Sequence, residues 1–147
     1  MSLPYILLVE DNPDDEELTL LSLRRHNLGH DIKVVRDGVE AVEFMSGEGQ
    51  YSGRDLSAMP TVVLLDLKLP KLDGLGVLKR LRADPRTRRQ PVVVLTSSSQ
   101  DADVIASYQL GANSYVRKPV EFNSFMEAVG SLGLYWVLIN TPPGRSA

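Results

Sequence analysis

The chain has 147 residues, the usual size of one folded domain and enough to enclose a hydrophobic core. Its composition, 43% hydrophobic and 24% charged, is typical of an ordinary globular protein, and its net charge of −3 argues against a nucleic-acid partner. The absence of cysteine excludes disulfides, thiolate metal sites and cysteine nucleophiles, and it favours a cytoplasmic location.

The first apolar segment, Tyr5 to Val9, predicts a buried strand. It is far shorter than the roughly 20 residues that a membrane span needs, so we expect no membrane segment. Two acids, Glu10 and Asp11, follow it directly. They lie where the strand ends and before the next element begins, so either a structural or a functional role is open to them at this point.

A helix is predicted over 13–25, because Asn12 is a good N-cap and Pro13 suits the first helical position. The acids at 14–17 then fall in its first turn, where the helix dipole favours negative charge, and they need no functional explanation. We expect the core side of this helix to be carried by Leu18, Leu21 and Leu20.

A second strand is predicted over 30–36 and a second helix over 39–45, followed by a Gly- and Ser-rich surface loop over 46–58. The third strand, 61–65, is apolar throughout, a pattern typical of a parallel sheet that is covered on both faces. It ends in Asp66. A carboxylate there lies at the carboxyl edge of the sheet, where open α/β folds bind ligands.

A third helix is predicted over 74–83, and the basic residues of 80–89 after it are interpreted as a solvated connection. A fourth strand over 91–95 ends in Thr96, and a helix over 101–110 follows. A fifth strand over 114–116 ends near Lys118, which precedes a proline and is therefore extended. The last helix is predicted from Glu121 to about Trp136.

Alternation of five strands with helices predicts a parallel sheet with right-handed crossovers and helices on both faces. All strand ends of such a sheet meet at one edge, which here gathers Glu10, Asp11, Asp66, Thr96 and Lys118. Carboxylates this close need a compensating cation, and oxygen ligands suit Mg²⁺. With Mg²⁺ and Lys118 offsetting the charge of a phosphoryl group, Asp66 could attack its phosphorus while the Thr96 hydroxyl binds one of its oxygens.

With this set of residues, from Leu7 to about Leu132, the chain resembles the receiver domain of the two-component response regulators. The resemblance implies a flavodoxin-like, doubly wound (βα)5 fold with strand order 2-1-3-4-5. It also implies that Asp66 is phosphorylated by a phosphohistidine of a sensor histidine kinase. Such a protein is not a turnover enzyme, since it catalyses only phosphoryl transfer to itself and slow autodephosphorylation.

The resemblance assigns further roles in the site. Mg²⁺ would be held by Glu10, Asp11, Asp66 and the backbone carbonyl of Lys68, and Thr96 and Tyr115 would be the switch pair. Two positions depart from the commonest pattern: Glu10 is one methylene longer than the usual aspartate, and Lys68 replaces a smaller or amide residue. We hypothesise that the Lys68 ammonium shields the phosphoryl group from water.

The expected organisation is a single receiver domain over 1–147, with a core over about 4–133 and a C-terminal extension over 134–147 and no output domain. The extension resembles that of regulators partnered with bacterial phytochrome kinases. The same likeness implies a homodimer through the last helix and the extension, although the extension could instead dock the kinase. The apolar residues for either contact are Leu134, Tyr135, Trp136, Leu138 and Ile139.

Three other classes of protein share part of this pattern. Aspartyl-phosphate phosphatases have an Asp-x-Asp motif at the nucleophile, and in this chain the position of the second aspartate is Lys68. A flavodoxin-like redox carrier must cradle a phosphate in its first turn, where Glu10 and Asp11 would repel it. A receiver-shaped interaction module that works without phosphorylation is the remaining alternative, and the presence of Asp66, Thr96 and Lys118 together argues against it.

Overall fold

The structure of the protein is a computed structural model, and it describes residues 4–25, 31–97, 106 and 108–131. Its sheet consists of β1 (Ile6–Val9), β2 (Ile32–Val35), β3 (Val62–Asp66), β4 (Val92–Thr96) and β5 (Ser114–Arg117). All neighbouring strands are parallel and their order is β2-β1-β3-β4-β5. The predicted doubly wound fold and its strand order 2-1-3-4-5 are therefore confirmed.

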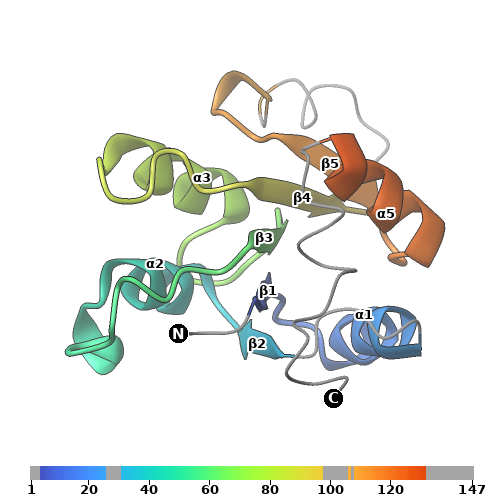
Figure 1. The fold of residues 1–147 in the computed structure, drawn as a ribbon, viewed down its shortest axis with the longest axis horizontal. Coiled ribbons are helices and arrows are strands. Elements are labelled where there is room, and N and C mark those ends of the chain that lie inside the picture. Colours follow the sequence, from blue (N-terminus) through green and yellow to red (C-terminus); the bar gives the residue numbers. More distant parts are fainter. Residues whose placement is uncertain (1–3, 26–30, 98–105, 107, 132–147) are drawn as a thin grey trace, which may run out of the picture.

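Helices cover both faces of the sheet (Figure 1). On one face lie α1 (Pro13–Arg25) and α5 (Phe122–Ser131), and on the other lie α2 (Gly38–Ser46) and α3 (Gly74–Ala83), with a short 3-10 helix, Gly49–Tyr51, after α2. None of the helices within the described part of the chain is long and apolar enough to cross a membrane. Most of the helix expected over 101–110, and the chain beyond Ser131, fall outside the described residues.

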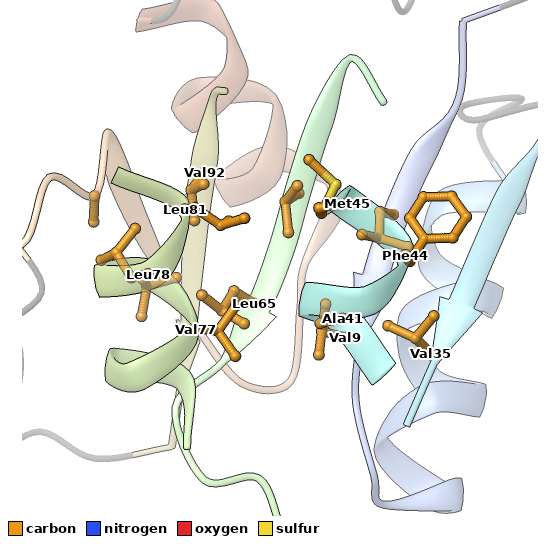
Figure 2. Packing of buried hydrophobic residues seen from close by; sticks show 14 of the residues in the cluster. Val9, Val35, Ala41, Phe44, Met45, Leu65, Val77, Leu78, Leu81 and Val92 are labelled. Atoms are coloured by element: carbon orange, nitrogen blue, oxygen red, sulfur yellow. The ribbon is translucent and has the colours of Figure 1, made fainter. Parts of the chain in front are cut away.

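Alternate strand residues divide the core into two apolar layers. Ile6, Leu8 and Leu64 face α1 and α5, where they pack with Leu23 and Phe125. The intervening strand residues face the other pair of helices, and Figure 2 shows this second layer, which includes Val9, Val35, Leu65, Val92, Ala41, Phe44, Met45, Val77, Leu78 and Leu81. Burial on both faces explains why the central strands β1, β3 and β4 carry no polar alternation.

The helix α1 is rotated differently from the expectation. Leu18 and Leu21, expected in the core, are 50% and 53% exposed, whereas Thr19 and Leu23 are buried and Leu20 packs against the core in part. The prediction of Leu18 and Leu21 as core residues was therefore wrong. Apolar residues lie on more than one side of this helix, so their spacing alone does not decide which side is buried, and the buried side includes a threonine.

Three helices that begin near the carboxyl edge of the sheet have side-chain N-caps. The Oδ1 atom of Asn12 accepts hydrogen bonds from the backbone N–H groups of Asp14 at 2.9 Å and Asp15 at 3.0 Å. Asp37 caps α2 through Glu40 N–H in the same way, and Asp73 caps α3. Caps of this kind fix where each helix begins, and therefore fix which of its first residues lie beside the edge.

Candidate functional site

The carboxyl ends of four strands bring the predicted residues to one edge of the sheet. Glu10 follows β1, Asp66 is the last residue of β3, Thr96 is the last residue of β4, and Lys118 follows β5. The register places Thr96 opposite Arg117 in the β4–β5 pair. The side chain of Thr96 is outside the described part of the structure, so its position is known only from the backbone.

Lys118 is the centre of the charged cluster at this edge. Its Nζ atom lies 2.9 Å from Asp66 Oδ2, 3.0 Å from Glu10 Oε1 and 2.9 Å from Asp15 Oδ2. The side chain is only 11% exposed, so these ion pairs are shielded from water far more than surface pairs are. The contact with Asp66 and Glu10 was expected from the topology, and the contact with Asp15 was not.

Both oxygens of the Asp66 carboxylate have a hydrogen-bond donor. Oδ2 accepts from Lys118, and Oδ1 accepts from the backbone N–H of Lys68 at 3.2 Å. The loop after β3 packs closely on the strand end: Gly74 N–H donates to the Leu67 carbonyl at 2.9 Å, and a Cβ atom on Gly74 would collide with the Asp66 carbonyl oxygen. A cavity of about 220 Å³ opens beside Asp66 and Lys68, so the carboxylate can be reached from solvent.

Three carboxylates are close enough to share one cation. Glu10, Asp11 and Asp66 each offer an oxygen, and these oxygens all lie within 4.8 Å of one another. Glu10 and Asp66 are buried while Asp11 is exposed, which leaves the site open on one side. A donor set of oxygens alone suits a hard cation such as Mg²⁺, which keeps part of its water shell, so the residues present fit the expected metal.

The electrostatics of the cluster follow from burial and from the crowding of like charges. Burial raises the pKa of Glu10 to about 7, and the neighbouring carboxylate of Asp66 adds to the rise, while Lys118 opposes it. Burial by itself would lower the pKa of Lys118, but its hydrogen bonds to Asp15, Asp66 and Glu10 outweigh burial and raise the pKa above its ordinary value. The ammonium is therefore charged at any physiological pH.

Tyr115 lies on the edge strand β5 and is 41% exposed. Its ring meets that of Tyr108 edge to face, with the ring centroids 6.1 Å apart and the planes at 83°. The ring therefore occupies an outward position on β5. The residues expected at a dimer or partner contact, Leu134, Tyr135, Trp136, Leu138 and Ile139, lie outside the described residues.

Asp15 is the site residue that sequence reasoning missed, and the rotation of α1 explains the omission. Asp15 is spaced by four residues from Thr19, which is spaced by four from Leu23, so the three share one helix face. Since Thr19 and Leu23 face the sheet, Asp15 is turned toward the strand ends. With Leu18 in the core, as expected, the helix would instead turn Asp14 toward the strand ends, because Asp14 is four residues before Leu18.

A family model and a curated relative both match this chain to one protein family. The model of the response regulator receiver domain matches residues 6–130. A curated relative, the response regulator Rcp1 of Synechocystis sp., is 38% identical over 138 residues, which cover 94% of this chain and 92% of that protein. The match therefore includes both the fold and the strand ends that carry the charged cluster.

Similar solved structures include regulators associated with phytochromes. The bacteriophytochrome response regulator RtBRR is 49% identical, with a TM-score of 0.84 and coverage of 97% of this chain and 86% of that one. The phosphorylated cyanobacterial phytochrome response regulator RcpA is 36% identical, with a TM-score of 0.75 and coverage of 92% and 95%. The Mn²⁺-bound form of Rcp1 is 36% identical, with a TM-score of 0.73 and coverage of 95% and 99%.

Proposed function

This chain belongs to the response regulator receiver family, and from that premise we propose that it accepts a phosphoryl group on Asp66 from a sensor histidine kinase. The observation that carries the proposal is the 2.9 Å contact between Lys118 Nζ and Asp66 Oδ2 within a group of carboxylates able to hold a cation. A carboxylate nucleophile beside fixed positive charge is what an incoming phosphoryl group requires.

In the proposed reaction, a carboxylate oxygen of Asp66 attacks phosphorus in line with its bond to the imidazole nitrogen of the kinase histidine. The O–P bond forms as the P–N bond breaks, and the electron pair of the broken bond stays on the imidazole nitrogen. Lys118, which already donates to Asp66, would donate to an oxygen of the transferred group and offset its charge. The protein turns over no separate substrate, and slow hydrolysis of its own phosphoaspartate is its only other proposed reaction.

We assign the cation to Mg²⁺, held by Glu10, Asp11, Asp66 and the backbone carbonyl of Lys68. The oxygen-only donor set of the three acids supports this assignment, and the related Rcp1 has a Mn²⁺-bound form. When bound, Mg²⁺ would neutralise charge on the phosphoryl oxygens. The length of Glu10 does not prevent its carboxylate from joining the other two acids.

We propose Thr96 and Tyr115 as the residues that convert phosphorylation into a change of shape. The Thr96 hydroxyl would bind a phosphoryl oxygen, and the Tyr115 ring would turn inward as it does so. The exposed position of Tyr115 on β5 supports this role, since an outward ring has an inward position still available to it. The edge strand β5 would then present a different surface to partners.

For the partner, we propose a bacterial phytochrome kinase in the cytoplasm. The similarity to the regulators RtBRR and RcpA, both named for phytochromes, supports this choice. We further propose a homodimer formed through the last helix and the extension over 134–147. The aromatic and aliphatic residues of 134–139 support that assembly, because so many apolar side chains close together are unusual on a free surface.

The proposal is tested by intact mass after incubation with acetyl phosphate, with and without Mg²⁺. We expect the protein to gain one phosphoryl mass only when Mg²⁺ is present, and the Asp66→Asn variant to gain none. Asp73→Asn is a matched control, because Asp73 is an acid of the same loop that caps α3 and is not part of the cluster. A folded protein that gains no mass under any condition would instead support an interaction module that works without phosphorylation.

A further inference from the structure

The ammonium group of Lys118 has all of its donors in use. A lysine offers three N–H donors, and Lys118 directs them to three different carboxylates at 2.9–3.0 Å. A phosphoryl group on Asp66 also needs a donor from this ammonium. One of the three existing hydrogen bonds must therefore be given up when the phosphoryl group arrives.

The three carboxylates that accept from Lys118 differ in their ability to bind a cation and in their other hydrogen bonds. Glu10 and Asp66 belong to the group of acids whose oxygens can share a cation, and Asp15 does not. Glu10 also accepts from Asn12 N–H at 3.3 Å, and Asp66 accepts from Lys68 N–H. Within the described part of the chain, Lys118 is the one hydrogen-bond donor to the Asp15 carboxylate.

The acceptors also differ in how easily water can replace the lysine. The side chain of Asp15 is 35% exposed, against 0% for Glu10 and 5% for Asp66. A carboxylate that is partly in water is rehydrated at small cost when it loses a partner, whereas a buried one is not. Asp15 is therefore the acceptor from which Lys118 is released most easily.

Neighbouring acids of the same helix turn do not share this position. Asp14 is exposed, and Glu16 forms its ion pair with Arg36 at 3.0 Å, away from Lys118. The Asn12 cap fixes the start of α1, and burial of Thr19 and Leu23 fixes its rotation, so Asp15 is directed at Lys118 by the fold. The contact is thus built into the helix and is not an accident of a flexible surface side chain.

We propose that Asp15 is a positioning residue, which holds Lys118 in the resting protein and releases one of its hydrogen bonds to the incoming phosphoryl group. The inference rests on the proposed function of Asp66. In this role Asp15 competes with the phosphoryl donor for Lys118 and adds a negative charge that opposes an anionic donor. It therefore sets how readily the protein is phosphorylated, without touching the reacting atoms.

The first test is the dependence of the phosphorylation rate on acetyl phosphate concentration at saturating Mg²⁺. For Asp15→Asn we expect the KM for acetyl phosphate to fall by about three- to tenfold with little change in kcat, because a neutral amide oxygen holds the Lys118 ammonium more weakly than a carboxylate does and releases it at a smaller cost. Asp15→Glu, which keeps the carboxylate, should return KM toward that of the unchanged protein. Asp14→Asn removes the same charge one residue away and should leave KM within about twofold.

A second test uses no covalent chemistry. Beryllofluoride, a mimic of the phosphoryl group, is titrated into the protein with Mg²⁺ and its affinity is followed by NMR of the backbone amides near Asp66. We expect tighter binding to Asp15→Asn than to the unchanged protein or to Asp14→Asn, by a similar about three- to tenfold. Asp15→Ser is a second variant with the same expected direction, should the asparagine variant fold poorly.

The possible failures are distinguishable. If the unchanged protein gains no phosphoryl group, the proposed function fails and this inference fails with it. If the unchanged protein is phosphorylated and Asp15→Asn shows the same KM as Asp14→Asn, the role of Asp15 alone is overturned. A lower kcat at constant KM in Asp15→Asn would also overturn it, since that result would mean that Asp15 supports the reactive position of Lys118 and does not compete for it.

Discussion

Two cations lie at opposite ends of the sheet strands and are held in different ways. Near the amino ends of β4 and β5, the Arg82 guanidinium donates to the carbonyls of Gly111 at 2.7 Å and Gln90 at 2.8 Å, and to Asn113 Oδ1 at 3.1 Å. All of these acceptors are neutral. At the carboxyl edge, the acceptors of Lys118 are three carboxylates.

The charge of the acceptors distinguishes a structural contact at Arg82 from a site at Lys118 where hydrogen bonds can be exchanged for those of a ligand. Burial lowers the pKa of Arg82, and its hydrogen bonds join α3 to the segments that precede β4 and β5. Around Lys118, one ammonium faces three carboxylates, so negative charge is in excess and a further cation is favoured there. The nature of the acceptors, more than the burial of the cation, indicates which edge is functional.

The largest expected effect comes from removing the cation at the carboxyl edge. Lys118→Met should lower the rate of phosphorylation by acetyl phosphate by on the order of 10²–10³-fold, the usual loss when one donor to a developing charge is removed. The initial rate is followed by intact mass at saturating Mg²⁺. Lys71→Met is the matched control, since Lys71 is exposed on the loop after β3 and its ammonium pairs with Asp37. A loss of less than about tenfold in Lys118→Met would contradict the role given to this lysine.

The next largest effect concerns stability at the other edge. Arg82→Met should lower the free energy of unfolding by about 2–4 kcal/mol, because several carbonyl acceptors lose their partner at once. Urea denaturation measures the loss, and Arg80→Met, an exposed change on the same helix, should stay within about 0.5 kcal/mol. Phosphorylation of folded Arg82→Met should proceed at the normal rate. An equal loss of phosphorylation in both cation variants would remove the distinction between the two edges.

A smaller effect is expected from pH, and it should be confined to the carboxyl edge. Glu10 has its pKa raised to about 7 by burial and by Asp66, so below that pH it binds a proton that Mg²⁺ must displace. The affinity for Mg²⁺ should therefore fall, by up to about tenfold per pH unit, as pH decreases below about 7. Calorimetric titration with Mg²⁺ across this range measures it.

The matched variants of this experiment are Glu10→Gln and Glu17→Gln. Glu10→Gln should bind Mg²⁺ more weakly at high pH and lose most of the pH dependence, whereas Glu17→Gln, an exposed change on α1, should behave like the unchanged protein. An unaltered pH dependence in Glu10→Gln would assign the titration to a different group.

The order of elements and the place of the site were predictable because both depend on local patterns. Apolar runs, each ended by a polar residue, predicted β1, β3 and β4, and parallel topology then brought Glu10, Asp66 and Lys118 together. The cap Asn12 was also predictable, since it hydrogen-bonds to residues two and three positions along the chain.

What was missed depends on contacts between distant parts of the chain. The rotation of α1 is decided by packing against the sheet, so Leu18 and Asp15 were both assigned to the wrong surroundings. Arg82 was interpreted as part of a solvated basic connection, whereas its acceptors include Gly111 and Asn113, about thirty residues later in the chain. No spacing within one helix encodes an interaction of that kind.

The most direct test of the central claim locates the phosphoryl group on the chain. After reaction with acetyl phosphate and Mg²⁺, the acyl phosphate is reduced with borohydride, which converts a phosphoaspartate to homoserine, and the peptides are sequenced by mass spectrometry. We predict homoserine at position 66, and none there when Mg²⁺ is omitted. Homoserine at position 11 or 15 in place of 66, or no homoserine in a protein that is folded, would contradict it.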